Sequence, residues 1–400
     1  MRLGFSLLII TGVVLTTATY FLVRYAQGYR LTFDRGNLFS KEVVKVESTG
    51  LLAATSSPDG ASVFVNGRLM SATNTTLTLQ PDEYKVKIVK EGYLPWEKTI
   101  KLQKEVVTQV QALLFPGAPR LDPLTSTGVS NPTPDPTGSR IAYAVASASA
   151  LSKNGIFVLD MSTRPIFPIR NNALQSADDT LDTLSASHLS WSPDGRELLL
   201  SLKNAQYLIR ASEFNTRPLN ITAALEETKV QWEKETNDQE KAKLESLQPK
   251  LSEFIQEHFS IISWSNDSTK ILYEASDSAK LPQFLDSPYV GANSQPEDRD
   301  INKNRLYVYD TKEDKNFFIK EADPNMPLPI WFPDNRHLVL IEEREIKMIE
   351  YDGTNKTTVY SGPFEGNFVY PWPDGSRLVI LTSLNPQSGV GPNLYTINLK

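Results

Sequence analysis

The phrase Trp191-Ser192-Pro193-Asp194-Gly195 recurs along the second half of the chain, and a hydrophobic strand pattern follows the copies. Variants stand at Trp264-Ser265-Asn266-Asp267, Trp331-Phe332-Pro333-Asp334-Asn335 and Trp372-Pro373-Asp374-Gly375, with a weaker copy at Pro134-Asp135-Pro136-Thr137-Gly138. Proline at the second position and glycine at the fourth suit a type I turn. Each copy therefore marks one supersecondary unit, and such units stack on their neighbours.

Further strand patterns complete each unit. A third strand is predicted after each motif, over residues 155–161, 206–211, 305–311, 345–351 and 393–399, and a weaker fourth strand often follows, as at 316–320 and 357–360. Four strands per unit, repeated radially, predict a β-propeller. Five motifs favour five blades, with six as the alternative. The last unit ends near Leu399, so residues 120–126 are a candidate for its missing outer strand.

The recurring acids and tryptophans have a structural interpretation. Asp194, Asp267, Asp334 and Asp374 occupy equivalent turn positions, where a carboxylate caps backbone N–H groups. The preceding tryptophans are expected to pack between blades, and a ligand-stacking role is the second interpretation.

Composition excludes several kinds of site. The 400 residues are enough for two or three domains, and 41 basic against 47 acidic residues give a net charge of −6. No dense basic stripe points to nucleic acid. The absence of cysteine excludes disulfides, thiolate metal sites and cysteine nucleophiles. The three histidines, His188, His258 and His337, lack metal-ligand spacing.

The amino-terminal residues predict a membrane anchor. No residue from Leu3 to Val23 is charged, and such a run, as a helix, is long enough to cross a bilayer. A cleaved signal peptide is the competing interpretation. We expect an anchor over residues 1–24 and a stalk over 25–47. Basic residues on both sides of the run make the positive-inside rule a weak guide to orientation.

Residues 48–115 read as a small β-sandwich, because short alternating strands are separated by turn signals. Asn66-Gly67 is its strongest hairpin signal. A linker rich in Pro, Gly, Ser and Thr follows over 116–135, and the propeller is expected over 136–400. The chain is thus mainly β: an amino-terminal helix, a small sandwich and a propeller.

The first β module resembles a PEGA domain. The residues that carry the resemblance are Pro58-Asp59-Gly60-Ala61, Val63-Phe64-Val65-Asn66-Gly67 and Gly92-Tyr93 with Trp96. Asp82-Glu83 departs from the glycine that this family usually has before its tyrosine strand. The resemblance implies a noncatalytic module of bacterial or archaeal envelope proteins, without a known ligand.

The repeats resemble those of TolB-like propellers, in which the turn and a hydrophobic strand are followed by a pattern like Leu306-Tyr307-Val308-Tyr309-Asp310. The resemblance covers most of residues 131–400. It implies the fold but not the function, because such repeats serve translocation accessories, lyases and peptidase gating domains.

Two insertions interrupt the repeats. Residues 223–259 are expected to form two helices broken near Gln248, because Pro249 follows and apolar residues recur at helical spacing, namely Leu244, Leu247, Leu251, Phe254 and Ile255. Packing on the propeller edge is one role for them, and a partner-binding protrusion is the other. Residues 276–304 are polar and proline-containing, and we expect a mobile loop.

Two groups of acidic residues are candidates for calcium sites. Glu297, Asp298 and Asp300 form one group, and Asp178, Asp179 and Asp182 form the other. Neither has the alternating ligands and central glycine of a calcium loop, so solvated surface acids are the expectation.

No catalytic signature is present. The sequence lacks a Gly-x-Ser-x-Gly elbow, a phosphate loop, a His-Glu-x-x-His motif and a dinucleotide fingerprint. His188 is a candidate for the propeller channel, although a structural histidine is the expectation. We therefore expect no catalytic residue, cofactor or metal.

Together these features predict a single-pass cell-membrane protein of the bacterial envelope, with its bulk outside, that binds another envelope protein or a glycan. The rival prediction is a propeller lyase or hydrolase acting on cell-wall glycan. A third is a purely structural spacer in a surface layer. The oligomeric state is left open.

Overall fold

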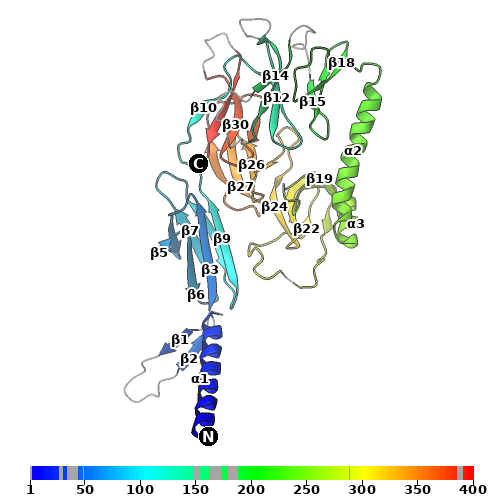
Figure 1. Ribbon diagram of the computed structural model, residues 1–400. Helices are drawn as coiled ribbons and strands as arrows, with labels where there is room; N and C mark the ends of the chain where they lie inside the picture. Colours follow the sequence, from blue (N-terminus) through cyan, green and yellow to red (C-terminus); the bar gives the residue numbers. More distant parts are fainter. Residues whose placement is uncertain are drawn as a thin grey trace. The chain divides into compact units, whose positions relative to one another are not determined.

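The computed structural model describes residues 2–26, 30–33, 44–47, 49–146, 153–162, 173–178, 188–287, 289–384 and 391–400, with side chains over 10–23 and from residue 49 onward (Figure 1). These residues form two compact units. The first contains Met1–Phe115 and Ser287–Pro296, and the second contains Pro116–Asp286 and Glu297–Lys400.

The first unit begins with helix α1 (Arg2–Ala26), and a short strand pair follows, β1 (Arg30–Phe33) with β2 (Val44–Glu47). All described side chains of α1, at residues 10–23, are exposed, and they include Val13, Leu15 and Phe21. Among the side chains that the structure describes, which cover only residues 10–23 of α1, no helix is long and apolar enough to cross a membrane.

The rest of the first unit is a β-sandwich. Its three-stranded sheet has the order β6-β3-β9, and its four-stranded sheet has the order β5-β4-β7-β8. The strands are β3 (Gly50–Ser57), β4 (Ser62–Val65), β5 (Arg68–Ala72), β6 (Thr75–Leu79), β7 (Glu83–Val89), β8 (Trp96–Lys101) and β9 (Val107–Leu113). Alternate residues of both sheets, such as Leu52, Val86 and Trp96, face inward and form the core. Asn66 and Gly67, with φ of 48° and 79°, make the hairpin between β4 and β5 that this dipeptide favours.

The second unit is built from four-stranded antiparallel sheets, and its described residues hold five of them. The first blade contains β11 (Ser130–Pro134), β12 (Arg140–Val145), β13 (Gly155–Asp160) and β14 (Ala173–Asp178), and the second β15 (His188–Trp191), β16 (Glu197–Ser201), β17 (Gln206–Arg210) and β18 (Leu219–Asn220). The third contains β19 (Phe259–Trp264), β20 (Lys270–Ala275), β23 (Arg305–Asp310) and β24 (Lys315–Glu321), and the fourth β25 (Ile330–Trp331), β26 (His337–Glu342), β27 (Glu345–Glu350) and β28 (Thr357–Tyr360).

The fifth blade joins the two ends of this unit. It contains β29 (Val369–Pro371), β30 (Arg377–Thr382) and β31 (Asn393–Asn398), and β10 (Leu121–Pro123) pairs with β31 as its outer strand. The sequence pointed to this segment because the last repeat is one strand short. The choice between five and six blades for the complete ring stays a prediction.

Apolar faces of neighbouring blades pack on one another. One core cluster joins the first and second blades, another the third and fourth, and a third cluster joins the fifth blade to the first. Four-stranded sheets repeated in this way form a β-propeller.

The repeated phrase forms the same turn in all five copies. The N–H of the last turn residue, which in the Trp264 copy is Ser268 directly after Asp267, donates to the carbonyl of the residue three positions earlier, at 2.8–3.1 Å. That last residue has a positive φ in each copy, between 56° and 72°, namely Gly138, Gly195, Ser268, Asn335 and Gly375. Glycine adopts this conformation without strain, which explains its place in the motif.

The second insertion is more structured than the mobile loop expected over 276–304. β21 (Ala279–Lys280) pairs with β22 (Asp300–Ile301), and Ile301 is buried in the third blade's core. The Asp314 carboxylate accepts hydrogen bonds from the backbone of Phe284 and Leu285, at 2.6 and 2.9 Å. Residues 287–296 belong to the first unit.

Candidate functional site

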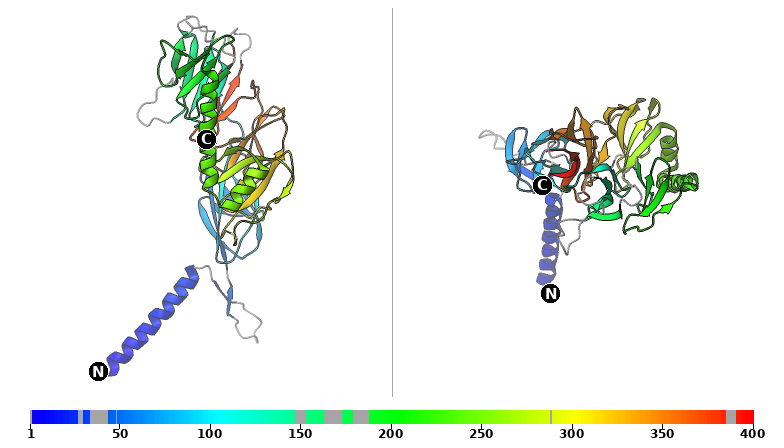
Figure 2. Two further views of the ribbon diagram at one scale, coloured as in Figure 1. Left: turned by 90° about the vertical axis from the view of Figure 1, so that its right-hand side faces the viewer. Right: turned by 90° about the horizontal axis from the view of Figure 1, so that it is seen from above.

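The helical insertion is the most distinctive feature of the second unit. α2 (Leu225–Glu245) runs from the end of β18 to α3 (Pro249–His258), which leads into β19 (Figure 1). Pro249 is the first residue of α3, where its missing N–H costs no helical hydrogen bond. Seen from above, the insertion lies at the periphery of the strands (Figure 2, right).

The two helices differ in how they are held. Leu251 and Ile255 of α3 are buried against the third blade, together with Leu244 at the end of α2. Of the 21 residues of α2, only Leu244 is buried. Pairs along the helix, such as Glu226 with Lys229 at 3.7 Å, contribute only about 0.2–0.5 kcal/mol each. A helix with so little packing presents most of its surface for contact.

A polar hollow of about 510 Å³ lies where α2 meets the second blade. The blade supplies residues of its motif turn, of strands β16 and β17 and of the segment after β17, whereas α2 supplies three residues within about one helical turn. Its lining is Ser192, Asp194, Arg196, Glu197, Arg210 and Ser212 from the blade, and Gln231, Trp232 and Glu235 from α2.

Hydrogen bonds hold several of these side chains in place. Ser192 Oγ donates to Asp194 Oδ1 at 2.7 Å, and Gln231 Nε2 donates to Glu235 Oε1 at 3.0 Å. The bond from Ser192 and that from the Arg196 N–H lower the pKa of Asp194. Its carboxylate is therefore ionised at neutral pH and serves as an acceptor rather than as a proton donor.

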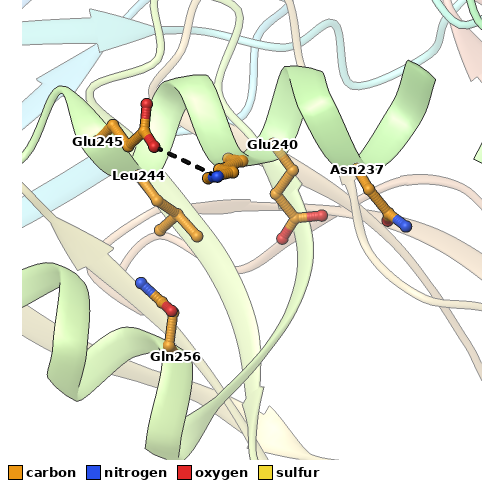
Figure 3. Close-up of a pocket in the computed structure, with 6 residues that line it drawn as sticks. Asn237, Glu240, Leu244, Glu245 and Gln256 are labelled. Atoms are coloured by element: carbon orange, nitrogen blue, oxygen red, sulfur yellow. Dashed lines mark ion pairs between the residues drawn. The ribbon is translucent and has the colours of Figure 1, made fainter. Parts of the chain in front are cut away.

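A smaller hollow of about 290 Å³ lies between the two helices (Figure 3). Leu244 and Gln256 line it beside the ion pair of Lys241 with Glu245, whose N···O distance is 3.7 Å. Its lining is mixed, with Leu244 as the apolar member and Asn237, Glu240, Lys241, Glu245 and Gln256 as the polar and charged ones.

The motif acids act as turn caps. Asp194, Asp267, Asp334 and Asp374 each accept a hydrogen bond from a backbone N–H two residues later in the same turn. Asp334 also accepts from His337 Nδ1 at 2.6 Å. Burial alone would raise the pKa of Asp334, but the bond from His337 and its charge outweigh burial and lower it.

Two of the motif tryptophans donate hydrogen bonds to a neighbouring blade, and a third does not. Trp191 Nε1 donates to the carbonyl of Thr133 in the first blade at 3.0 Å, and Trp331 Nε1 donates to that of Ser263 in the third blade at 3.5 Å. Trp264 Nε1 is buried without a hydrogen-bond partner. Ser190 of the second blade would be its equivalent acceptor, and the helical insertion lies in the chain between these two blades.

The other candidates are dispersed. His188 is an exposed residue at the start of β15, and His258 Nδ1 lies 2.8 Å from Asp277 Oδ1. Glu297 pairs with Arg299, and Asp298 accepts the backbone N–H of Asp300. Asp178 ends β14, whereas Asp179 and Asp182 lie outside the described residues. No group of three or more His, Asp or Glu residues in the described ranges is arranged to hold a metal ion.

A comparison with protein families identifies the β-sandwich of the first unit. Residues 49–117 match the PEGA domain. Among curated proteins, no sequence matches this chain.

Solved structures with similarity to this chain include TolB-type proteins. One is described as a TolB from Agrobacterium tumefaciens, with 14% identity, a TM-score of 0.23 and coverage of 67% of this chain and 79% of that one. TolB from Acinetobacter baumannii has 14% identity and a TM-score of 0.21, and the match covers 80% of this chain and 61% of that one. The β-propeller domain of Cps50 (Swd1) from Myceliophteria thermophila has 10% identity and a TM-score of 0.28, and the match covers 71% of this chain and 100% of that one. The propeller assignment rests on the chain's own five sheets.

Proposed function

We propose that this protein is an envelope-attached binding protein that captures another envelope protein through α2. The observation that carries this is a 21-residue helix with one buried residue, which α3 attaches to the third blade through its buried residues. Val230 on α2 exposes 63% of its surface among charged neighbours, an arrangement suited to a partner's apolar side chain.

The amino-terminal helix is proposed to hold the protein in the cell membrane, with both β units outside. Support comes from the uncharged run Leu3–Val23 and from the exposed apolar side chains along residues 10–23. The PEGA match is consistent with an envelope location. Fractionation should place the chain in membranes, and protease added to intact cells should remove the propeller; a fully protected propeller would contradict this orientation.

The inner strands give the rival enzyme no support. A glycan lyase or hydrolase in the channel needs clustered histidine, arginine and carboxylate side chains. The first strands of the five blades, β11, β15, β19, β25 and β29, contain no arginine, lysine or acid, and His188 is their single histidine. These strands therefore offer no cluster of the kind that a glycan lyase or hydrolase needs, and binding stays our proposal.

The proposal is tested by crosslinking the full-length chain to its neighbours in the native membrane and measuring the recovery of the envelope protein that it captures. Val230→Asp should reduce recovery of the captured envelope protein at least tenfold. Leu69→Asp is the matched control, because Leu69 of β5 is an apolar side chain of similar exposure, 58%. Equal recovery with both variants would rule out α2 as the capture surface.

A further inference from the structure

The six tryptophans of the chain have unequal surroundings. Trp96 belongs to the sandwich core, and Trp191, Trp331 and Trp372 are buried in the blades. Trp264 lies under the ammonium of Lys243, 5.7 Å from the ring centroid. Trp232 instead lines the hollow between α2 and the second blade, where every other lining side chain is polar or charged. Trp232 is therefore the single aromatic side chain that lines this hollow.

The charges of the hollow select against ionic ligands. Asp194, Glu197 and Glu235 bring three carboxylates, whereas Arg196 and Arg210 bring two guanidinium groups. The acids disfavour a phosphate or other anion, and the two arginines disfavour a cationic peptide. Both kinds of group remain good partners for a neutral polyol, since carboxylates accept hydrogen bonds from hydroxyls and guanidinium groups donate to them.

An aromatic face completes this recognition chemistry. A sugar ring has an apolar C–H face and a rim of hydroxyls, so it can pack on an indole while its rim bonds to charged groups. The volume of about 510 Å³ lies within the range of roughly 300–1,000 Å³ typical of small-ligand sites.

Part of the hollow is organised in advance. Gln231 fixes Glu235, Ser192 fixes Asp194, and Arg210 Nη1 contacts Glu213 Oε1 at 3.2 Å. Side chains held in this way lose little conformational freedom when a ligand binds. Arg196, with a side chain 84% exposed, pairs with Asp194 of the same turn, and its Nε lies 3.5 Å from Asp194 Oδ2.

We infer that this hollow binds a neutral saccharide chain, with its ring face on Trp232 and its hydroxyls on the flanking carboxylates and guanidinium groups. The inference goes beyond capture of a protein and does not depend on it. Because Val230 does not line the hollow, the two activities have separate variants.

Titration of the detergent-solubilised full chain with chitotetraose, cellotetraose and maltotetraose, followed by calorimetry, tests the inference. At least one should bind saturably, and Trp232→Ala should weaken that binding at least tenfold. Trp232→Phe, which keeps an aromatic face, should weaken it less. Phe214→Ala is the control, since Phe214 is an exposed aromatic residue of the same blade that does not line the hollow.

Three results would overturn the inference. The first is the absence of saturable binding by all three sugars to folded protein. The second is sugar binding that Trp232→Ala leaves unchanged, and the third is a preference for inorganic phosphate over each sugar. Protein capture sensitive to Val230→Asp would persist in each case, so failure of the saccharide site is distinguishable from failure of the proposed function.

Discussion

Replacing Trp191 and Trp264 separately by phenylalanine isolates one hydrogen bond between blades. Both indoles occupy the same motif position, and each lies beside a cation: Arg140 is 5.1 Å from the Trp191 ring centroid, and Lys243 is 5.7 Å from that of Trp264. They differ in the indole N–H, which Trp191 donates to Thr133 at 3.0 Å and Trp264 leaves unpaired.

The expected magnitude follows from that difference. Both variants lose ring volume and part of a cation–π contact, so these costs largely cancel in the comparison. Trp191→Phe also loses a hydrogen bond and deprives the Thr133 carbonyl of its donor, whereas Trp264→Phe removes a buried donor that has no partner. The extra cost at Trp191 is therefore about 1–2 kcal/mol.

Thermal unfolding followed by circular dichroism measures the difference. At roughly 2–4 °C per kcal/mol, Trp191→Phe should melt about 2–8 °C below Trp264→Phe in the same buffer. Equal melting temperatures, or a lower one for Trp264→Phe, would refute the assignment of Trp191 as a link between blades and of Trp264 as an unpaired donor.

Three further changes probe the propeller. Asp334→Asn should lower the free energy of unfolding by about 1–3 kcal/mol at neutral pH. Because His337 lowers the folded-state pKa of Asp334, the stability difference from wild type, measured by denaturant titration, should hold above about pH 5 and shrink in more acidic buffer. A difference that does not change with pH would contradict this. Ser268→Gly should raise the free energy of unfolding by up to about 1 kcal/mol, since glycine adopts the observed φ of 56° without strain; lower stability would count against the turn argument. Asp122 and Thr396 face each other across β10 and β31, so the double variant Asp122→Cys with Thr396→Cys should form a disulfide. That disulfide should raise Tm, and a reducing agent should remove the rise. A fully formed disulfide that leaves Tm unchanged would argue against β10 as the closing strand.

Much of the fold could be predicted from the sequence because turn residues mark where strands end and hairpins form. Gly195 and Gly375 mark turns that need a positive φ, and Asn66-Gly67 marks a hairpin, so these signals depend only on neighbouring residues. The closing strand β10 was inferable because strand counting left the last blade incomplete. Pro249 marked the start of α3 for a similarly local reason.

The candidate site was much less predictable. The hollow joins a turn and strands of the second blade to Trp232 of α2, and no periodicity shows which face of a polar helix meets a given strand. The unpaired N–H of Trp264 depends on how two blades meet, which its motif does not encode. The short strands of the second insertion and the contacts of its backbone with Asp314 could not be predicted, because Asp314 belongs to a later hairpin. A signal was available in Trp232, the one tryptophan outside every strand and motif.

Photo-crosslinking in native cells tests the capture of an envelope protein by α2 most directly. A photoreactive amino acid replaces Val230 in one strain and Leu69 in the other, and the crosslinked products are identified by mass spectrometry. Our account predicts one predominant envelope protein at position 230 and its absence at position 69. The same products at both positions, or products only at position 69, would contradict it.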